Sequence, residues 1–185
     1  MKKHLLLSTV VMALTIMLNS CKSADMQIPI AINTVNSVGL KELNLKHGTD
    51  YTIMNSVTAE ATVIYTSRQR GKIITIKEEN GEFEAKWKYD FKSGRMIRKD
   101  FDGIARFGFL NNDYSHGSIV TDEIAPEYFV RNLAIYRLIN QAKVRGADGV
   151  IEPVLSTNAE NRGKHDIVFK TTVSAKLMKL NTDAK

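Results

Sequence analysis

The chain has 185 residues, with 26 Lys and Arg against 20 Asp and Glu, which gives a formal net charge of +6 at pH 7. Its length is typical of one domain, and a chain of this size can bury roughly 70% of its unfolded surface. Because the sequence contains one cysteine, a framework of intrachain disulfides is excluded.

Residues 1–20 have the pattern of a lipoprotein signal peptide. Two lysines follow the first methionine, an apolar run occupies residues 5–18, and Asn19 stands where Ala, Ser or Thr is usual before Cys21. The apolar run is shorter than the roughly 20 residues that a membrane span needs. We therefore predict that Cys21 is lipidated and becomes the first residue of the mature chain. The alternative is a buried or free cysteine at the end of an uncleaved helix.

The same pattern predicts a location. Lipid chains at Cys21 hold a protein on a membrane without a spanning helix. Lys22 follows the cysteine where Asp favours retention in the inner membrane, so we expect the cell envelope and an outer-membrane location, facing either the periplasm or the surface. Loss of two signal lysines lowers the net charge from +6 to +4. An exported basic protein meets lipid phosphates and acidic glycans, and nucleic acid is not an expected partner.

The mature chain is expected to contain a tether and one domain. Residues 21–37 form the lipidated N-terminus and a tether that ends in a strand over 28–35, where Pro29 favours a sheet edge. Residues 38–182 form a single α+β domain. Within it, residues 51–66 alternate between apolar and polar side chains, which is typical of a half-buried antiparallel strand.

Residues 72–91 are predicted to form a β-hairpin about Asn80-Gly81. Asn-Gly favours a two-residue turn because both central positions of that turn need positive φ. The resulting register gives three pairs: Ile76 with Ala85, Ile74 with Trp87, and Lys77 with Glu84. These pairs set apolar side chains opposite apolar ones and join opposite charges.

One face of this hairpin is aromatic. Its residues are Phe83, Ala85, Trp87, Tyr89 and Phe91. Such a stripe is expected to pack on the rest of the sheet. The alternative is an exposed platform that stacks on a glycan or touches lipid. On that hypothesis the candidate ligand-binding residues are Trp87, Tyr89, Arg95 and Arg98.

Residues 92–99 are expected to be a basic loop. Its cations are Arg95, Arg98 and Lys99, and those of an earlier turn are Arg68, Arg70 and Lys72. The two groups approach each other if the strand ends meet. We expect a solvated face, and the alternative is an anionic headgroup or glycan site. Residues 100–103 resemble the start of a calcium loop, but the later carboxylates are missing, so a turn is predicted.

After a strand over 104–110 and a polar loop over 111–118, one long helix is predicted over 126–145. Thr121-Asp122-Glu123 and Pro126 are start signals, and Gly146 ends the helix. Its broad apolar side contains Phe129, Leu133, Ile135, Tyr136, Ile139 and Ala142. That width indicates a helix laid on a sheet.

The C-terminal part is expected to supply two more strands. The first, over 150–155, contains Pro153, which requires an edge or a bulge. A polar loop over 158–166 leads to a clearly alternating strand over 167–180. The fold class predicted is therefore α+β, with a mostly antiparallel sheet and one long helix packed on one face.

A resemblance supports this class. Residues 133–151, with Gly146-Ala147-Asp148-Gly149 before a strand and a long strand after it, resemble the helix-Gly-Ala-Asp-strand-strand unit of YbjQ-like and RcsF-like proteins. Residues 50–54, which precede the alternating residues 57–65, together with that unit resemble small uncharacterised lipoproteins of Bacteroidota. The resemblance implies a helix on a sheet and no agreed activity. RcsF-like proteins signal through disulfides, and this chain lacks the cysteines for that role.

The sequence offers no recognisable catalytic motif. His47, His116 and His165 lack the spacing of a metal motif, and a Gly-x-Ser-x-Gly elbow is absent. No catalytic residue, metal or cofactor is predicted. We expect a membrane-anchored envelope lipoprotein that acts as a non-enzymatic binding or assembly module, with an envelope protein or a glycan as partner. The alternatives are a glycan- or lipid-binding lipoprotein and an enzyme of unrecognised type.

Overall fold

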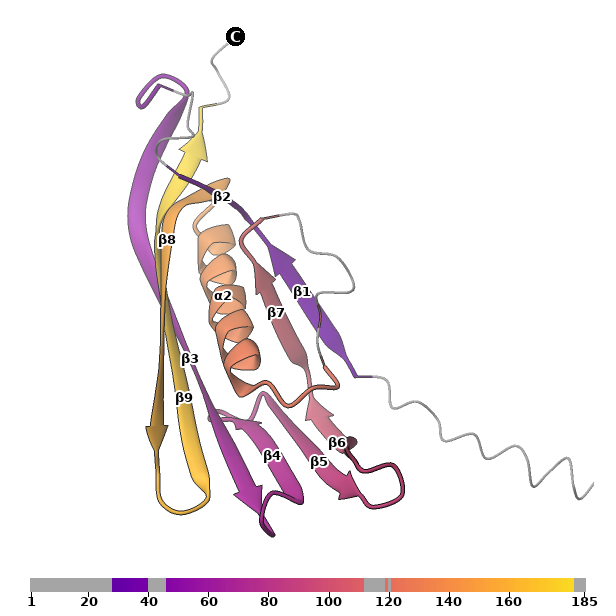
Figure 1. Cartoon of the computed structure of the whole chain (residues 1–185). Helices are drawn as coiled ribbons and strands as arrows, with labels where there is room; N and C mark the ends of the chain where they lie inside the picture. Colours follow the sequence, from indigo (N-terminus) through magenta and orange to yellow (C-terminus); the bar gives the residue numbers. More distant parts are fainter. Residues whose placement is uncertain (1–27, 40–45, 112–118, 120, 182–185) are drawn as a thin grey trace, which may run out of the picture.

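The computed structural model describes residues 28–39, 46–111, 119 and 121–181. These residues form an α+β fold in which a helix packs on a seven-stranded, mostly antiparallel sheet (Figure 1). The predicted signal peptide and Cys21 lie outside the described residues. Within the part that is described, no helix is both long enough and apolar enough to cross a membrane.

The large sheet has the strand order β2-β8-β9-β3-β4-β5-β6. Its strands are β2 (Asn36–Val38), β8 (Gly149–Asn161), β9 (Asp166–Leu180), β3 (Tyr51–Arg68), β4 (Ile73–Glu78), β5 (Phe83–Asp90) and β6 (Arg95–Gly103). Only β2 and β8 are parallel neighbours in this sheet, and the other pairs are antiparallel. Buried side chains alternate along β3 and β9, so these strands place one face against the core.

A second sheet consists of β1 (Ile30–Thr34) and β7 (Ala105–Phe109), which pair in parallel. The backbone N–H of Ala105 donates to Pro29 O at 2.9 Å, and that of Val35 donates to Phe109 O at 3.1 Å. The chain passes from β1 in the small sheet to β2 in the large sheet, and later from β6 in the large sheet to β7 in the small sheet. The two sheets are therefore connected at two places along the chain. The strand predicted over 28–35 at the end of the tether corresponds to β1, which lies in a two-stranded sheet as Pro29 favoured, and parallel pairing of β1 and β2 incorporates residues 30–38 into the fold.

The helix, α2 (Pro126–Val144), has the bounds predicted to within one residue. Its burial is wider than one apolar side, because α2 contacts β3 and β9 of the large sheet and also β7 and β1 of the small sheet (Figure 1). Val130, Ala134 and Leu138, which lie outside the predicted side, are fully buried. The helix is thus held between two sheets.

Gly108 sets how closely β7 approaches this helix. A Cβ built on Gly108 would lie 2.1 Å from the backbone N of Tyr136 and 2.5 Å from the carbonyl carbon of Ile135. Real side chains do not tolerate such contacts, so only glycine fits. The absence of a side chain here lets the small sheet pack directly on the helix backbone.

The hairpin formed by β4 and β5 has the predicted register, including the pairs Ile76 with Ala85 and Ile74 with Trp87. The predicted turn type is wrong. The loop has four residues, 79–82, and Gly81 alone among them has positive φ. The cause is the Glu78 carboxylate, whose Oε2 accepts hydrogen bonds from the backbone N–H groups of Asn80 at 2.6 Å and Glu82 at 3.1 Å.

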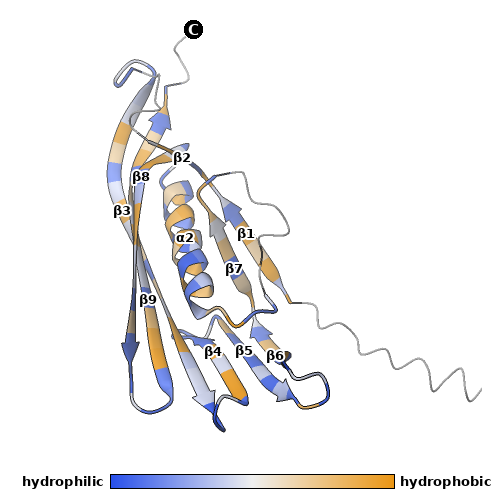
Figure 2. Ribbon diagram, in the orientation of Figure 1, coloured by the Kyte–Doolittle hydropathy of each residue, from blue (hydrophilic) through white to orange (hydrophobic). Residues whose placement is uncertain are grey.

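Three other sequence predictions need correction. The loop over 92–99 and the turn over 100–103 are mostly strand β6, which pairs with β5. The loop over 158–166 begins later, because β8 continues to Asn161 as part of a hairpin with β9. The last residues of β8 are polar because both faces of the strand are exposed to solvent there, and Figure 2 shows hydrophilic colour at this end of the hairpin. Of the edge or bulge predicted at Pro153, the structure has an irregularity of the bulge kind, a register shift between Ile151 and Val154.

Candidate functional site

The structure separates the four residues predicted as ligand-binding candidates. Trp87 is 1% exposed, and its indole N–H donates to the backbone O of Asp122 at 3.0 Å. An exposed platform at Trp87 is therefore wrong, because Phe83, Ala85 and Trp87 pack into the core as predicted for this face, whereas Phe91 at its end is exposed. Tyr89 is half-buried and lies edge-on to Phe91, with ring centres 5.2 Å apart.

Arg98 and Arg95 also have different surroundings. Arg98 Nη1 donates to Thr121 O at 2.9 Å and forms an ion pair with Asp122. It therefore fastens the segment before α2 to strand β6 and is not free for an external ligand. Arg95 is exposed at the first position of β6.

Three turns lie together at one end of the large sheet (Figure 1). They are residues 68–73 between β3 and β4, residues 90–95 between β5 and β6, and residues 161–166 between β8 and β9. We call these three turns the basic edge. Ser67 N donates to His165 O at 2.9 Å, and Tyr89 N donates to Lys72 O at 2.8 Å. These contacts join each neighbouring pair of turns, so the predicted meeting of strand ends occurs at Lys72 but not at Arg98.

The basic edge has a strong excess of positive charge. Its cations are Arg68, Arg70, Lys72, Lys92, Arg95, Arg162 and Lys164, and its acids are Asp90 and Asp166. Seven positive charges against two negative ones leave an excess of five, almost the whole net charge of +6. All seven cations are exposed, and within the described part of the chain none of them forms an ion pair. Such a concentration attracts anions.

A hollow of about 540 Å³ lies between two of these turns. Its lining residues are Tyr65, Ser67, Arg70, Gly71, Asn161, Gly163, Lys164, His165, Asp166 and Ile167. Arg70 and Lys164 supply charged donors from opposite turns, and Tyr65 and Ser67 supply hydroxyl groups. Phosphate, sulfate and carboxylate are the groups that such donors bind.

The turn at Arg70 has an unfavourable backbone. Gln69 and Arg70 have φ of 52° and 56°, a region that glycine or asparagine occupies at lower cost. Tight turns between antiparallel strands favour this left-handed conformation because it matches the twist of the strands. The backbone of Gln69, Arg70 and Gly71 is therefore explained by the hairpin of β3 and β4.

The Asp90 carboxylate is hydrogen-bonded within its own turn. Its Oδ2 accepts hydrogen bonds from the hydroxyl of Ser93 at 2.7 Å and the backbone N–H of Ser93 at 3.0 Å. The side-chain hydrogen bond from Ser93, followed by that from its backbone, lowers the pKa of Asp90. The carboxylate orders residues 90–95 and forms no ion pair with a described cation of the edge.

A buried charge network lies away from this edge. Glu78 is 0% exposed, and its Oε1 is 2.9 Å from Nη2 of Arg137, which also pairs with Glu82. Arg106 Nη1 lies 2.5 Å from Oε2 of Glu82. Burial opposes the charge on Arg137, but hydrogen bonds to Glu82 and Glu78 outweigh it and raise the pKa of Arg137. The network joins the β4–β5 turn to α2 and β7, which is a structural role.

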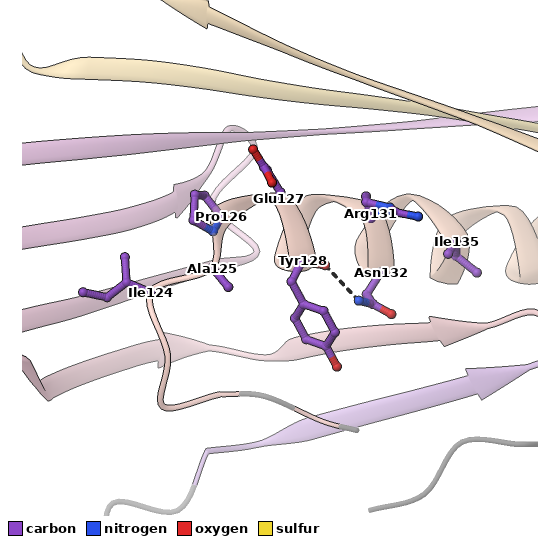
Figure 3. Close-up of a pocket in the computed structure, with 8 residues that line it drawn as sticks. All are labelled: Ile124, Ala125, Pro126, Glu127, Tyr128, Arg131, Asn132 and Ile135. Carbon is purple, nitrogen blue, oxygen red and sulfur yellow. Dashed lines mark hydrogen bonds between the residues drawn. The ribbon is translucent and has the colours of Figure 1, made fainter. Parts of the chain in front are cut away.

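A second hollow, of about 710 Å³, lies beside the start of α2 (Figure 3). Its lining residues are Ile124, Ala125, Pro126, Glu127, Tyr128, Arg131, Asn132 and Ile135. Figure 3 shows Tyr128 and Asn132 on one side of the helix and Glu127 on another. None of the eight is Ser, Thr, Cys or His, so this lining offers no nucleophile of those types beside a base. Among the described residues, no group of three His, Cys, Asp or Glu could hold a metal ion.

The fold and the basic edge define an α+β protein with a helix between two sheets and a cationic end. No protein-family model matches the chain, and no curated protein or solved structure matches it significantly. The resemblance to YbjQ-like and RcsF-like proteins stays a prediction. Sequence reasoning missed the contributions of Phe91, Arg162 and Lys164 to the edge. A count of charge at each expected turn would have found the two cations.

Proposed function

We propose that this chain is an envelope lipoprotein, anchored through Cys21, that acts as a non-enzymatic binding module and holds an anionic partner on its basic edge. The observation that carries the proposal is the excess of five positive charges over three adjoining turns. Charges placed together on one end of a molecule raise the local concentration of anions and speed their association. Lys22 after the anchor favours the outer membrane.

The contacts within the edge suit a surface site better than a catalytic one. Its cations project from three turns, and the hollow between Arg70 and Lys164 is lined by residues of two hairpins. Binding to such a site is expected to weaken steeply with salt, because exposed charges are screened within about 8 Å at physiological ionic strength. A partner that carries several phosphate, sulfate or carboxylate groups fits the width of the edge.

The anchor is tested by labelled fatty acid. Cells that produce the full chain are expected to incorporate label into it, and the protein remains with the membranes after a high-salt wash. Cys21→Ala is expected to abolish both the label and the retention. Equal labelling of the Cys21→Ala variant would overturn the anchoring part of the proposal.

The edge is tested with the acylated protein in detergent and a sulfated dextran matrix. Wild-type protein is expected to bind at low salt and to elute as salt rises. The double variant Arg70→Glu/Lys164→Glu is expected to pass through unretained. Lys176→Glu reverses one charge, half the change of the double variant, ten residues along β9 from Asp166, and is expected to bind like wild type. Equal loss in both variants would reduce the edge to a non-specific effect of net charge.

A further inference from the structure

We infer that the basic edge lies on the phosphate headgroups of the bilayer that holds the acyl chains of Cys21, so that the protein binds one membrane by lipid and by charge. This inference rests on the proposed function and names the anionic partner as phospholipid. Its first support is an aromatic residue among the cations. Phe91 is 72% exposed at the end of β5, inside the turn of residues 90–95.

The surroundings of Phe91 are those of an interfacial side chain. Lys72 Nζ lies 4.7 Å from the centre of its ring, and Tyr89 packs edge-on at 5.2 Å. Aromatic rings with basic neighbours favour the level of lipid headgroups, where the ring contacts the acyl boundary and the cations contact phosphate. A sugar stacked on the ring face that Lys72 covers would displace this lysine, whereas an interfacial ring keeps it.

The length of chain before the fold matches this orientation. Nine residue steps separate Cys21 from Ile30, where β1 begins, and such a segment spans at most about 32 Å. Ile30 pairs with Ala105, close to the end of β6 at Gly103. The basic edge begins at the other end of β6, about 27 Å away along the strand. The segment therefore reaches far enough for the edge to touch the bilayer, and it is too short to let the fold drift far away.

The opposite end of the molecule provides a matched reference. Helix α2 runs away from the basic edge and ends at Val144, which is 88% exposed (Figure 1). If the edge faces the membrane, Val144 faces away from it. Ser93 in the edge and Val144 can each be replaced by cysteine for labelling. The one natural cysteine carries lipid in the proposed mature protein, so each variant has one free thiol.

The test uses acylated Ser93→Cys and Val144→Cys proteins, each labelled with an environment-sensitive dye and reconstituted through the anchor. One set of vesicles is phosphatidylcholine, and the other is an equal mixture of phosphatidylcholine and phosphatidylglycerol. A lipid-attached quencher in both sets reports contact with the bilayer. We expect quenching at position 93 in the mixed vesicles, loss of that quenching at 1 M salt where screening falls to about 3 Å, and no quenching at position 144.

Charge reversal provides the second arm. Arg70→Glu/Lys164→Glu is expected to reduce the fraction of position 93 at the bilayer by about fivefold for each positive charge removed, while Lys176→Glu leaves it unchanged. Equal quenching at positions 93 and 144, or equal quenching in both vesicle sets, would overturn the inference. Retention on sulfated dextran without quenching at position 93 would overturn the membrane orientation but preserve the proposed anion-binding function. Loss of both would overturn both.

Discussion

The Nζ of Lys72 lies 4.7 Å from the centre of the Phe91 ring, which joins the turn of residues 68–73 to the turn of residues 90–95. Both side chains are exposed. Their contact is therefore available to a partner, and an exposed cation–π pair adds little to the stability of the fold. The pair combines the two properties of the basic edge, which are positive charge and an uncovered aromatic ring.

Phe91→Ala is expected to reduce quenching at position 93 in mixed phosphatidylcholine and phosphatidylglycerol vesicles several-fold, because the interfacial ring is lost. The free energy of unfolding is expected to change by less than about 0.5 kcal/mol, as is usual for surface positions. Quenching of the anchored protein and urea titration measure the two effects. Val154→Ala removes another exposed apolar side chain, on β8, and is expected to leave the quenching unchanged. A similar loss for both variants would contradict a specific role for Phe91.

Glu78→Gln is expected to lower the free energy of unfolding by about 2 kcal/mol, because Arg137 loses one of its two carboxylate partners and keeps Glu82. The adjacent residue gives the control. Glu79 is exposed, and Glu79→Gln is expected to change stability by less than about 0.5 kcal/mol. Urea titration of both variants checks the difference. Equal stabilities would show that the charge of Glu78 does not hold the β4–β5 turn to α2.

Gly108→Ala is expected to lower the free energy of unfolding by about 3 kcal/mol, because the new Cβ meets the backbone of α2. Gly149→Ala gives a graded comparison. There the Cβ would lie 3.1 Å from the flexible end of Met178 and 3.2 Å from Asn36 O, so a smaller loss is expected. Thermal unfolding ranks the two variants. A wild-type melting temperature for Gly108→Ala would mean that the small sheet does not pack on the helix backbone as described.

Asp148 is expected to make part of the stability depend on pH. Its Oδ2 accepts from the backbone N–H of Leu180 at 2.9 Å, and its Oδ1 accepts from Lys179 at 3.1 Å. The backbone hydrogen bond, and then the lysine, lower the pKa of Asp148 in the folded state. A lowered pKa stabilises the fold above the unfolded value, near 3.9, and this contribution disappears as pH falls through the folded value.

Asp148→Asn is therefore expected to be less stable than wild type at pH 7, with a gap that closes as the pH falls below about 4. Urea titrations across this range measure the gap. Asp102→Asn removes an exposed carboxylate of β6 and serves as control at pH 7, where it is expected to change stability by less than about 0.5 kcal/mol. A gap of constant size would assign the effect of Asp148 to geometry instead of charge.

The sequence predicted local structure well where one pattern determined it. Asn80-Gly81 and the alternation around it fix the register of β4 and β5. Strand β6 was missed because Lys99 lies in a register shift, between the pairs Lys86 with Asp100 and Trp87 with Arg98. The shift breaks the period of two and turns Arg98 to the same side as buried Trp87. That reversal explains why Arg98 contacts Asp122 and does not join the basic edge.

Features that depend on contacts between distant parts of the sequence were harder to predict. The pattern of α2 predicted one apolar side, since a helix wheel does not reveal that two sheets pack on the helix and bury Val130 and Leu138 outside that side. The basic edge depends on pairing between β3 and β9, which brings Ser67 beside His165. Each turn alone has the composition of an ordinary solvated loop. Their combined charge becomes visible only when the strand order is known.

The central claim is that three turns act as one anion-binding surface. Its most direct test measures how binding to a sulfated dextran matrix, with the protein in detergent, falls with salt. The acylated protein is compared with three single variants, one in each turn: Arg70→Glu, Arg95→Glu and Lys164→Glu. The account predicts that each variant weakens binding and flattens the salt dependence, while Lys176→Glu matches wild type. Weakening by only one of the three, or by Lys176→Glu to the same extent, would contradict it.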